Sequence, residues 1–262
     1  MKQADPQFPL VRAILFDWGD TLVRPPGITT NPVGHFECVK RFFHADLQPA
    51  IINSGGEHLQ WSTFRDEYNE ATMDHVRRTL RTGREHSFAM RIQSTLARCG
   101  QSDLLNDSAC LRLGNALGHY ISLTSVPIEG ARETVSDLAK LYRIGLLSNY
   151  PHAPAVRQSL AAADILKHLH EIVISAEIGW SKPSPQAFEA AMQALDTPPE
   201  SILFVGDDLE NDMRGARAMG MRTAWLPRAE QRELVDGIDH ELVDIRLESI
   251  SDLLQILDRP IV

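Results

Sequence analysis

The sequence lacks the features that would place the protein in a membrane or outside the cell. Its three cysteines, Cys38, Cys99 and Cys110, form an odd set without a CxxC pair, which is typical of reduced thiols. No apolar run approaches the roughly 20 residues that span a bilayer. The N-terminal segment contains Asp5 and two prolines and does not resemble a secretory signal. We therefore expect a cytoplasmic protein that does not insert into membranes.

An excess of positive charge is also missing. The chain of 262 residues has 35 acidic and 26 basic side chains, which gives a net charge of -9. Such a chain is not drawn to nucleic acid or anionic lipid by its overall charge. The predicted partner is a small molecule, with no nucleic acid and no membrane, and the sequence leaves the oligomeric state open. The length is sufficient for a full hydrophobic core.

Five short apolar segments predict the strands of a parallel sheet. They are RAILFD at 12–17, RIGLLS at 143–148, EIVIS at 171–175, SILFVG at 201–206 and RTAWL at 222–226. The last four are separated by helix-like stretches such as SPQAFEAAMQALD, which favours parallel strands joined by crossover helices. Because these runs are continuously apolar, both faces of the sheet should be covered. The predicted fold class is α/β, with a Rossmann-like parallel-sheet core.

The first predicted strand is followed by about a hundred residues that carry almost no strand pattern. Apolar residues recur there at helical spacing, as at Phe64, Tyr68, Ala71, Val76 and Leu80. Breaks rich in proline and glycine, RPPG and SVPIEG, mark the edges of this segment. We expect an α-helical domain at 24–126, inserted into a core formed by 1–23 and 127–262.

Polar residues follow four predicted strands or their connections at the edge where open parallel sheets bind ligands. The first group is Asp17, Asp20 and Thr21, in LFDWGDTL. The other groups are Ser148 and Asn149 in LLSNYP, Lys182 in GWSKPSP, and Asp207, Asp208 and Asp212 in FVGDDLENDMRGA. A single aspartate after a strand is often only a helix N-cap. Four such groups in this order indicate a ligand site.

With these four motifs in order, the chain resembles the haloacid dehalogenase superfamily, in the branch with a helical cap inserted after the first strand. The similarity extends over the whole chain, including VPIEGARETVSDLAKL before the second motif and SAEIGWSKPSPQAF around the third. The resemblance implies a covalent mechanism. Asp17 would be the nucleophile, giving an aspartyl-phosphate that water then hydrolyses.

The resemblance also implies a magnesium site. Asp17, the backbone carbonyl of Gly19 and Asp207 would be ligands of Mg²⁺, which prefers hard oxygen donors. Asp212 would support the metal or orient Lys182. Carboxylates brought together would otherwise raise one another's pKa, and a bound cation removes that conflict. The alternative is that the acidic residues after the fourth strand only cap the next helix.

Positive charge beside the nucleophile is needed because a carboxylate must approach a phosphate of the same sign. Lys182 would supply it. The resemblance places Lys182, Ser148, Asn149 and Thr21 in the phosphate-binding set, where donors stabilise charge that spreads in the transition state. As isolated residues, serine and asparagine are more often turn formers, and Lys182 would be a loop lysine.

One position departs from the family's pattern. Its phosphatases normally carry a second aspartate two residues after the nucleophile, as general acid and base, and this chain has Gly19 there. The side chain of Asp20 would face the other way in an extended backbone. Asp20 can therefore take over only through a local change of conformation, and is otherwise a turn residue. General acid–base assistance typically contributes about 10²- to 10⁴-fold.

Several functions follow from this pattern. The leading prediction is a Mg²⁺-dependent hydrolase of small phosphorylated metabolites. A noncatalytic, regulatory phospholigand-binding protein is the alternative that Gly19 favours. A dehalogenase needs no metal, which the intact GDDLEND argues against. A phosphonate hydrolase uses a cap lysine, and Lys40 is the only lysine in the segment. Arg77, Arg81 and Arg84 could receive a second anionic group of the substrate, or form a solvated face.

Overall fold

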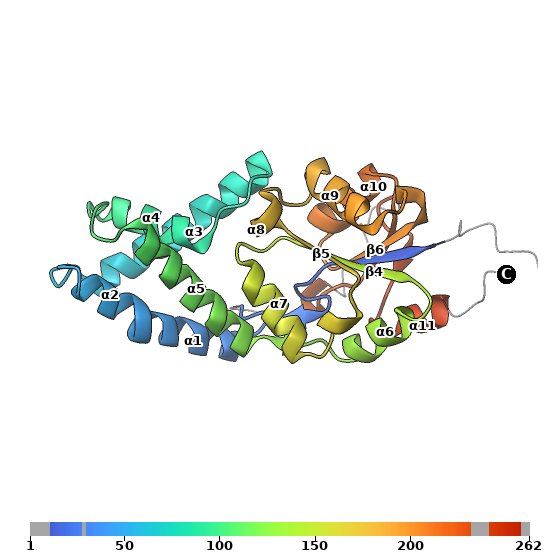
Figure 1. The fold of residues 1–262 in the computed structure, drawn as a ribbon, viewed down its shortest axis with the longest axis horizontal. Coiled ribbons are helices and arrows are strands. Elements are labelled where there is room, and N and C mark those ends of the chain that lie inside the picture. The colour runs from blue at the N-terminus through green and yellow to red at the C-terminus, as the bar shows by residue number, and fades with distance from the viewer. Residues whose placement is uncertain (1–10, 28–29, 232–240, 258–262) are drawn as a thin grey trace, which may run out of the picture. The chain divides into compact units, whose positions relative to one another are not determined.

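The structure is a computed structural model that describes residues 11–27, 30–231 and 241–257 (Figure 1). Contacts divide these residues into two compact units. The first consists of the described residues up to Arg24, of Val126–Asn149 and of those from Ser159 onward, and the second of Pro25–Ser125 and Tyr150–Gln158.

The first unit is built on a six-stranded sheet in which all neighbouring strands are parallel. Its order is β5-β4-β1-β6-β7-β8. The strands are β1 (Ala13–Phe16), β4 (Arg143–Ser148), β5 (Glu171–Ile174), β6 (Ile202–Gly206), β7 (Arg222–Trp225) and β8 (Ile245–Arg246). The predicted α/β class and its five strands are confirmed. The sequence did not predict β8, which has only two residues.

Helices cover the sheet on both sides. In Figure 1, α9 and α10 lie on one side of the strands, and α6 and α11 lie on the other. The longer helices of this unit are α6 (Ala131–Leu138), α9 (Pro185–Leu195) and α11 (Asp252–Leu257), and the short ones are α8 (Ser175–Ile178) and α10 (Gly215–Ala218). A two-stranded antiparallel sheet joins β2 (Val23–Arg24) to β3 (Val126–Pro127).

The apolar strand sequences account for the position of this core. All four residues of β1 and all five of β6 are buried. Leu15, Phe204 and Trp225 pack with Phe188 of α9 in one hydrophobic cluster. Burial of each such side chain stabilises the fold by about 1.5–3 kcal/mol relative to exposure. The buried strands thereby fix where their carboxyl ends lie.

The second unit is helical. Its helices are α1 (Pro32–Arg41), η1 (Phe42–Leu47), α2 (Gln48–Ile52), α3 (Trp61–Thr82), α4 (Phe88–Arg98) and α5 (Asp107–Thr124), joined by the first part of α7 (Ala153–Ala162). Side chains such as Phe42, Phe64, Ile92 and Leu113 form its core. Although α3 has 22 residues, no helix in the described ranges is apolar enough over a sufficient length to cross a membrane.

The buried face of α3 differs from the predicted one in its second half. Phe64 and Ala71 are buried as the spacing predicts, but Val76 is 38% and Leu80 63% exposed, whereas His75 is 4% exposed. A step of four residues from Ala71 stays on one face of a helix, and a step of five turns well away from it. The histidine therefore takes the core position that the apolar pattern assigned to Val76.

Contacts place Tyr150–Gln158 in the helical unit, although the sequence analysis assigned them to the core domain. Tyr150 packs edge-on against Phe88, with the ring centroids 6.0 Å apart. Further along, His152 shares a 3.1 Å hydrogen bond with Asn115. These partners lie far away in sequence, so spacing alone does not reveal them. The role of the helical unit as a cap stays a prediction.

Candidate active site

Three aspartates converge at the carboxyl edge of the sheet. Asp17 directly follows β1 and Asp207 directly follows β6, and these strands are neighbours. The backbone N–H of Asp17 donates to the carbonyl of Val205 at 2.8 Å. Asp212 comes from the helical turn η4 (Leu209–Arg214). All three side chains are buried, and one carboxylate oxygen from each lies within 4.8 Å of the others.

Lys182 joins two of these aspartates from the loop before α9. Its Nζ lies 2.6 Å from Oδ1 of Asp17 and 2.7 Å from Oδ1 of Asp212, and the residue is 3% exposed. Burial alone would lower the pKa of Lys182, but the two carboxylates outweigh it and hold the pKa above its usual value. The buried ammonium therefore remains charged beside the predicted nucleophile.

Asn149 has a task that the sequence analysis did not predict. Its Oδ1 accepts from the backbone N–H of Lys182 at 2.7 Å, and its Nδ2 donates to the carbonyl of Lys182 at 2.8 Å. The carboxamide thus fixes the backbone that carries the lysine. Ser148, the last residue of β4, is buried next to it. Phosphate binding by Ser148 and Asn149 stays a prediction. Asn149 would have to bind phosphate through the Nδ2 hydrogen that is not bonded to Lys182, or through its backbone N–H.

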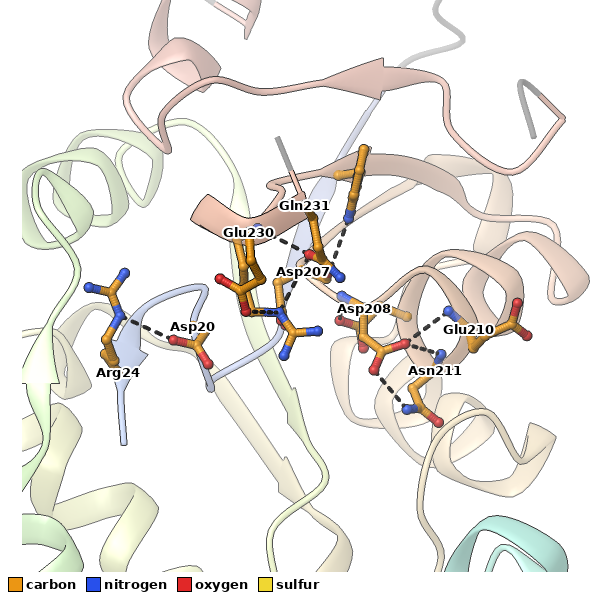
Figure 2. Close-up of polar contacts among 11 residues, drawn as sticks. Asp20, Arg24, Asp207, Asp208, Glu210, Asn211, Glu230 and Gln231 are labelled. Carbon is orange, nitrogen blue, oxygen red and sulfur yellow. Dashed lines mark hydrogen bonds and ion pairs between the residues drawn. The ribbon is translucent and has the colours of Figure 1, made fainter. Parts of the chain in front are cut away.

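The acidic cluster carries more negative charge than Lys182 balances. Burial, together with the charges of Asp17 and Asp212, raises the pKa of Asp207 to about 9. Burial also raises the pKa of Asp212 to about 7, although Lys182 opposes the rise. A second cation lies near Asp207, because Nε of Arg228 is 3.3 Å from its Oδ2 (Figure 2).

Asp208 is a capping residue. Its Oδ1 accepts from the backbone N–H groups of Glu210 and Asn211, both at 2.9 Å, and its other oxygen accepts from the Asn211 side chain (Figure 2). These bonds satisfy donors at the start of η4. The capping alternative therefore holds for Asp208, whereas the buried carboxylate of Asp212 points to Lys182.

Gly206 leaves the room that Asp212 occupies. A Cβ on this glycine would lie 2.3 Å from Oδ2 of Asp212. That oxygen accepts from the backbone N–H of Asp208 at 3.2 Å. A larger residue at the end of β6 would therefore displace the carboxylate from the cluster.

Asp20 has the local change of conformation that a catalytic role requires, but its side chain pairs elsewhere. Its φ is +54°, in the left-handed region that aspartate tolerates. Its Oδ1 accepts from Nε of Arg24 at 3.2 Å (Figure 2). Burial raises the pKa of Asp20, opposed by the hydrogen bond and charge of Arg24. The structure does not bring this carboxylate into the group formed by Asp17 and Lys182.

The remaining residues of the first motif are close to the core. Trp18 is buried and donates from Nε1 to Ser159 at 3.1 Å, so it packs inside the first unit. Thr21 is fully buried, and its hydroxyl has no hydrogen-bond partner in the described ranges. Gly19 forms an isolated bridge with Val23. The predicted phosphate contact of Thr21 and the metal contact of the Gly19 carbonyl stay predictions.

Two site neighbours were missed by the sequence analysis, and both belong to the β7 connection. The indole Nε1 of Trp225 donates to the backbone carbonyl of Asp207 at 2.8 Å. Arg228 follows β7 by three residues. The position of these two residues in the sequence could have indicated the site, because β7 ends at the same edge of the sheet as β1 and β6. An apolar tryptophan and a loop arginine do not, however, suggest a site by their type.

The donor set suits a magnesium ion. It consists of buried carboxylate oxygens that are close enough to share one cation. Three carboxyl groups stand beside the single positive charge of Lys182. Asp17, Asp207 and Asp212 are oxygen donors of the hard type that Mg²⁺ selects. The residues therefore fit the metal that the sequence pattern implied.

Comparison with known proteins places this arrangement in a family. The family model of haloacid dehalogenase-like hydrolases matches residues 11–220. The chain belongs to this family of hydrolases. It is 35% identical over 105 residues to a glyceraldehyde 3-phosphate phosphatase of Methanopyrus kandleri, which covers 39% of this chain and 45% of the relative. Matches to the first curated relatives span only 31% to 57% of their length.

Solved structures of the family share the fold. The HAD hydrolase YfnB of Bacillus subtilis, bound to magnesium, aligns with a TM-score of 0.61 at 17% identity, over 95% of this chain and all of that one. A 2-haloacid dehalogenase of Pseudomonas syringae aligns with a TM-score of 0.68 at 16% identity, over 95% of this chain and 99% of that one. At these identities the likeness shows the fold alone.

Proposed function

We propose that the protein is a Mg²⁺-dependent phosphatase of small phosphorylated metabolites that acts through a phosphorylated Asp17. One observation carries the proposal. The carboxylate that follows β1 is buried with two further carboxylates and with the ammonium of Lys182, 2.6 Å from its Oδ1. Asp207 and Asp212 add buried negative charge beside Asp17, which a divalent cation would offset.

The chain's own residues have separable tasks in this reaction. Lys182 attracts the phosphate and offsets the charge of Asp17 as the two anions approach. An oxygen of Asp17 then bonds to phosphorus while the bond to the leaving oxygen breaks, and water later cleaves the aspartyl-phosphate to release phosphate. Asn149 holds the backbone of Lys182 in place throughout.

Asp17, Asp207 and the Gly19 carbonyl would hold Mg²⁺, with Asp212 in support. When bound, the ion supplies positive charge to the phosphoryl oxygens and to the carboxylates around them. The buried position of these aspartates keeps water from screening that charge. The phosphatase relative from Methanopyrus kandleri supports the phosphatase part of this proposal.

Substrates with good leaving groups fit the first motif best. Gly19 offers no side-chain acid, and the carboxylate of Asp20 pairs with Arg24. Without an acid, a basic alcohol oxygen leaves slowly, whereas the leaving oxygen of an acyl phosphate needs little protonation. We expect acetyl phosphate to be hydrolysed faster than p-nitrophenyl phosphate, and that in turn faster than an alkyl phosphate.

The test compares the Asp17→Asn variant with the unaltered protein on acetyl phosphate and p-nitrophenyl phosphate, with and without Mg²⁺. We expect turnover that requires Mg²⁺ and falls by about 10³-fold or more in the variant, because a carboxamide cannot form the aspartyl-phosphate. Asp244→Asn is the control, since Asp244 pairs with Arg217 instead. Hydrolysis that survives Asp17→Asn would reject the covalent mechanism.

The second candidate is a noncatalytic phospholigand-binding protein, which the glycine at position 19 favours. It predicts that a phosphometabolite raises the melting temperature while none is hydrolysed. The dehalogenase alternative predicts release of halide from a 2-haloacid without Mg²⁺. For the phosphonatase alternative, Lys40 is exposed on α1 and lies over the ring of Phe36 at 5.7 Å. A test with phosphonoacetaldehyde, in Lys40→Ala and in the unaltered protein, decides this last case.

A further inference from the structure

Arg228 stands between the buried acidic cluster and solvent. Its Nε is 3.3 Å from Oδ2 of Asp207 and 3.8 Å from Oε1 of Glu230, two residues that Figure 2 labels. The exposed fraction of the side chain is 9% for Asp207, 32% for Arg228 and 56% for Glu230. One guanidinium therefore has a buried and an exposed carboxylate within reach.

The segment after β7 holds this arginine at Asp207. The side-chain carbonyl of Gln231 accepts from the backbone N–H of Arg228 at 3.1 Å and from its Nε at 3.4 Å. At the end of β7, Trp225 donates to the backbone carbonyl of Asp207. The strand and its loop thus contact the same aspartate through its main chain and its side chain.

Charge balance gives Arg228 a particular part in the cluster. Lys182 pairs with Asp17 and Asp212, which leaves Arg228, among the residues that the structure describes, as the cation in contact with Asp207. A divalent cation shared by the three carboxylates would stand close to the guanidinium. Two cations on one buried carboxylate repel each other strongly because little water lies between them. Glu230 offers the guanidinium a solvated partner within the same short segment.

We propose that Arg228 is an exchangeable counterion: it pairs with Asp207 while the metal is away and turns to Glu230 when a divalent cation binds. The proposal rests on the metal site of the proposed function and adds a residue that governs metal affinity. Binding of Mg²⁺ must displace the guanidinium, so its affinity reflects a competition. Arg228 favours the metal-free state and Glu230 the metal-bound state.

The test measures Mg²⁺ affinity by titration calorimetry for Arg228→Gln, Glu230→Gln and the double variant. We expect Arg228→Gln to bind Mg²⁺ about tenfold more tightly, because the competing cation is gone. Glu230→Gln should bind about threefold more weakly, because the guanidinium loses its second partner. In the double variant the effect of Glu230→Gln should vanish, which shows that it acts through Arg228. Arg217→Gln, which removes an arginine from an Asp244 pair, should leave the affinity unchanged.

Weaker or unchanged binding in Arg228→Gln would overturn the proposal, because the arginine would then only orient Asp207. A second measurement needs no metal. In EDTA, Arg228→Gln should lower the melting temperature by about 2–4 °C, since the buried carboxyl group of Asp207 loses the side chain that contacts it at 3.3 Å. If the unaltered protein binds no Mg²⁺, the metal site of the proposed function fails. The melting temperature then decides the counterion role, and an unchanged value rejects it.

Discussion

The two units bury different kinds of side chain. The first encloses three carboxylates and an ammonium at the edge of its sheet, whereas the core of the second, in the described residues, consists mostly of aromatic and aliphatic side chains. The arginines of the second unit form exposed pairs, such as Arg77 with Asp74 and Arg98 with Glu67. Exposed pairs contribute roughly 0–1 kcal/mol each, while removing one member of a buried pair costs several times more.

Lys182→Met should produce the largest difference in stability between the two units. It leaves Asp17 and Asp212 buried without their cation, so we expect the first unit to lose about 3–5 kcal/mol of unfolding free energy and phosphatase activity to disappear. Hydrogen exchange followed by mass spectrometry reads the two units separately. Arg98→Met is the matched control, because it breaks an exposed pair of the helical unit and should cost at most about 1 kcal/mol. Equal losses in the two variants would contradict the comparison.

Gly206→Ala tests the space that the acidic site needs. The added methyl group meets Asp212, so we expect a loss of about 1–3 kcal/mol together with a weaker affinity for Mg²⁺, measured by calorimetry. Gly145→Ala, on strand β4, would place its methyl group 3.1 Å from methyl carbons of the buried Leu15 and Leu195, away from the acidic cluster. It should lower stability without changing the affinity. Unaltered Mg²⁺ binding in Gly206→Ala would show that Asp212 is not needed at its present position.

Asn149→Ala removes the clamp on the backbone of Lys182. The loss of two partly buried hydrogen bonds should cost about 1–3 kcal/mol and lower kcat, because the ammonium loses its fixed position. Asn115→Ala offers a comparison in the helical unit, where the exposed side chain bonds to His152. It should cost less than about 1 kcal/mol. A KM effect with kcat preserved would mean that Asn149 serves binding and does not position the lysine.

His75 gives the helical unit a stability that depends on pH. Burial, with the nearby positive charges of His86, Arg91 and Arg78, lowers its pKa to about 4. The unfolded chain binds the proton near pH 6.5, so the stability due to neutral His75 is complete above that pH and is lost as pH falls toward 4. We expect the helical unit to lose about 2 kcal/mol between pH 7 and pH 5, by urea unfolding monitored with hydrogen exchange.

His75→Leu should remove most of that dependence, because the substituted side chain has no proton to gain. His119→Asn, which alters an exposed histidine of α5, should keep it. If the slope with pH is the same in all three proteins, His75 does not set it.

The sequence predicted those parts of the molecule that depend on local pattern. Continuous apolar runs predicted five strands, and aspartates directly after β1 and β6 predicted carboxylates at one edge, because neighbouring parallel strands end together. It did not predict contacts that depend on how loops fold back. Asn149 meets Lys182 across 33 residues, and Asp20 turns to Arg24 through a left-handed backbone. The contact of Arg228 with Asp207 likewise depends on the path of a loop.

The order of the strands sets when the acidic site can exist during synthesis. Asp17 emerges from the ribosome early, yet β6, the strand beside it, follows about 190 residues later. Contacts between such distant segments form late, since a long loop must close first. A nascent chain that ends before residue 207 holds Asp17, the proposed nucleophile, but neither Asp207 nor Asp212 beside it. Incomplete products of translation should therefore not hydrolyse phosphate esters.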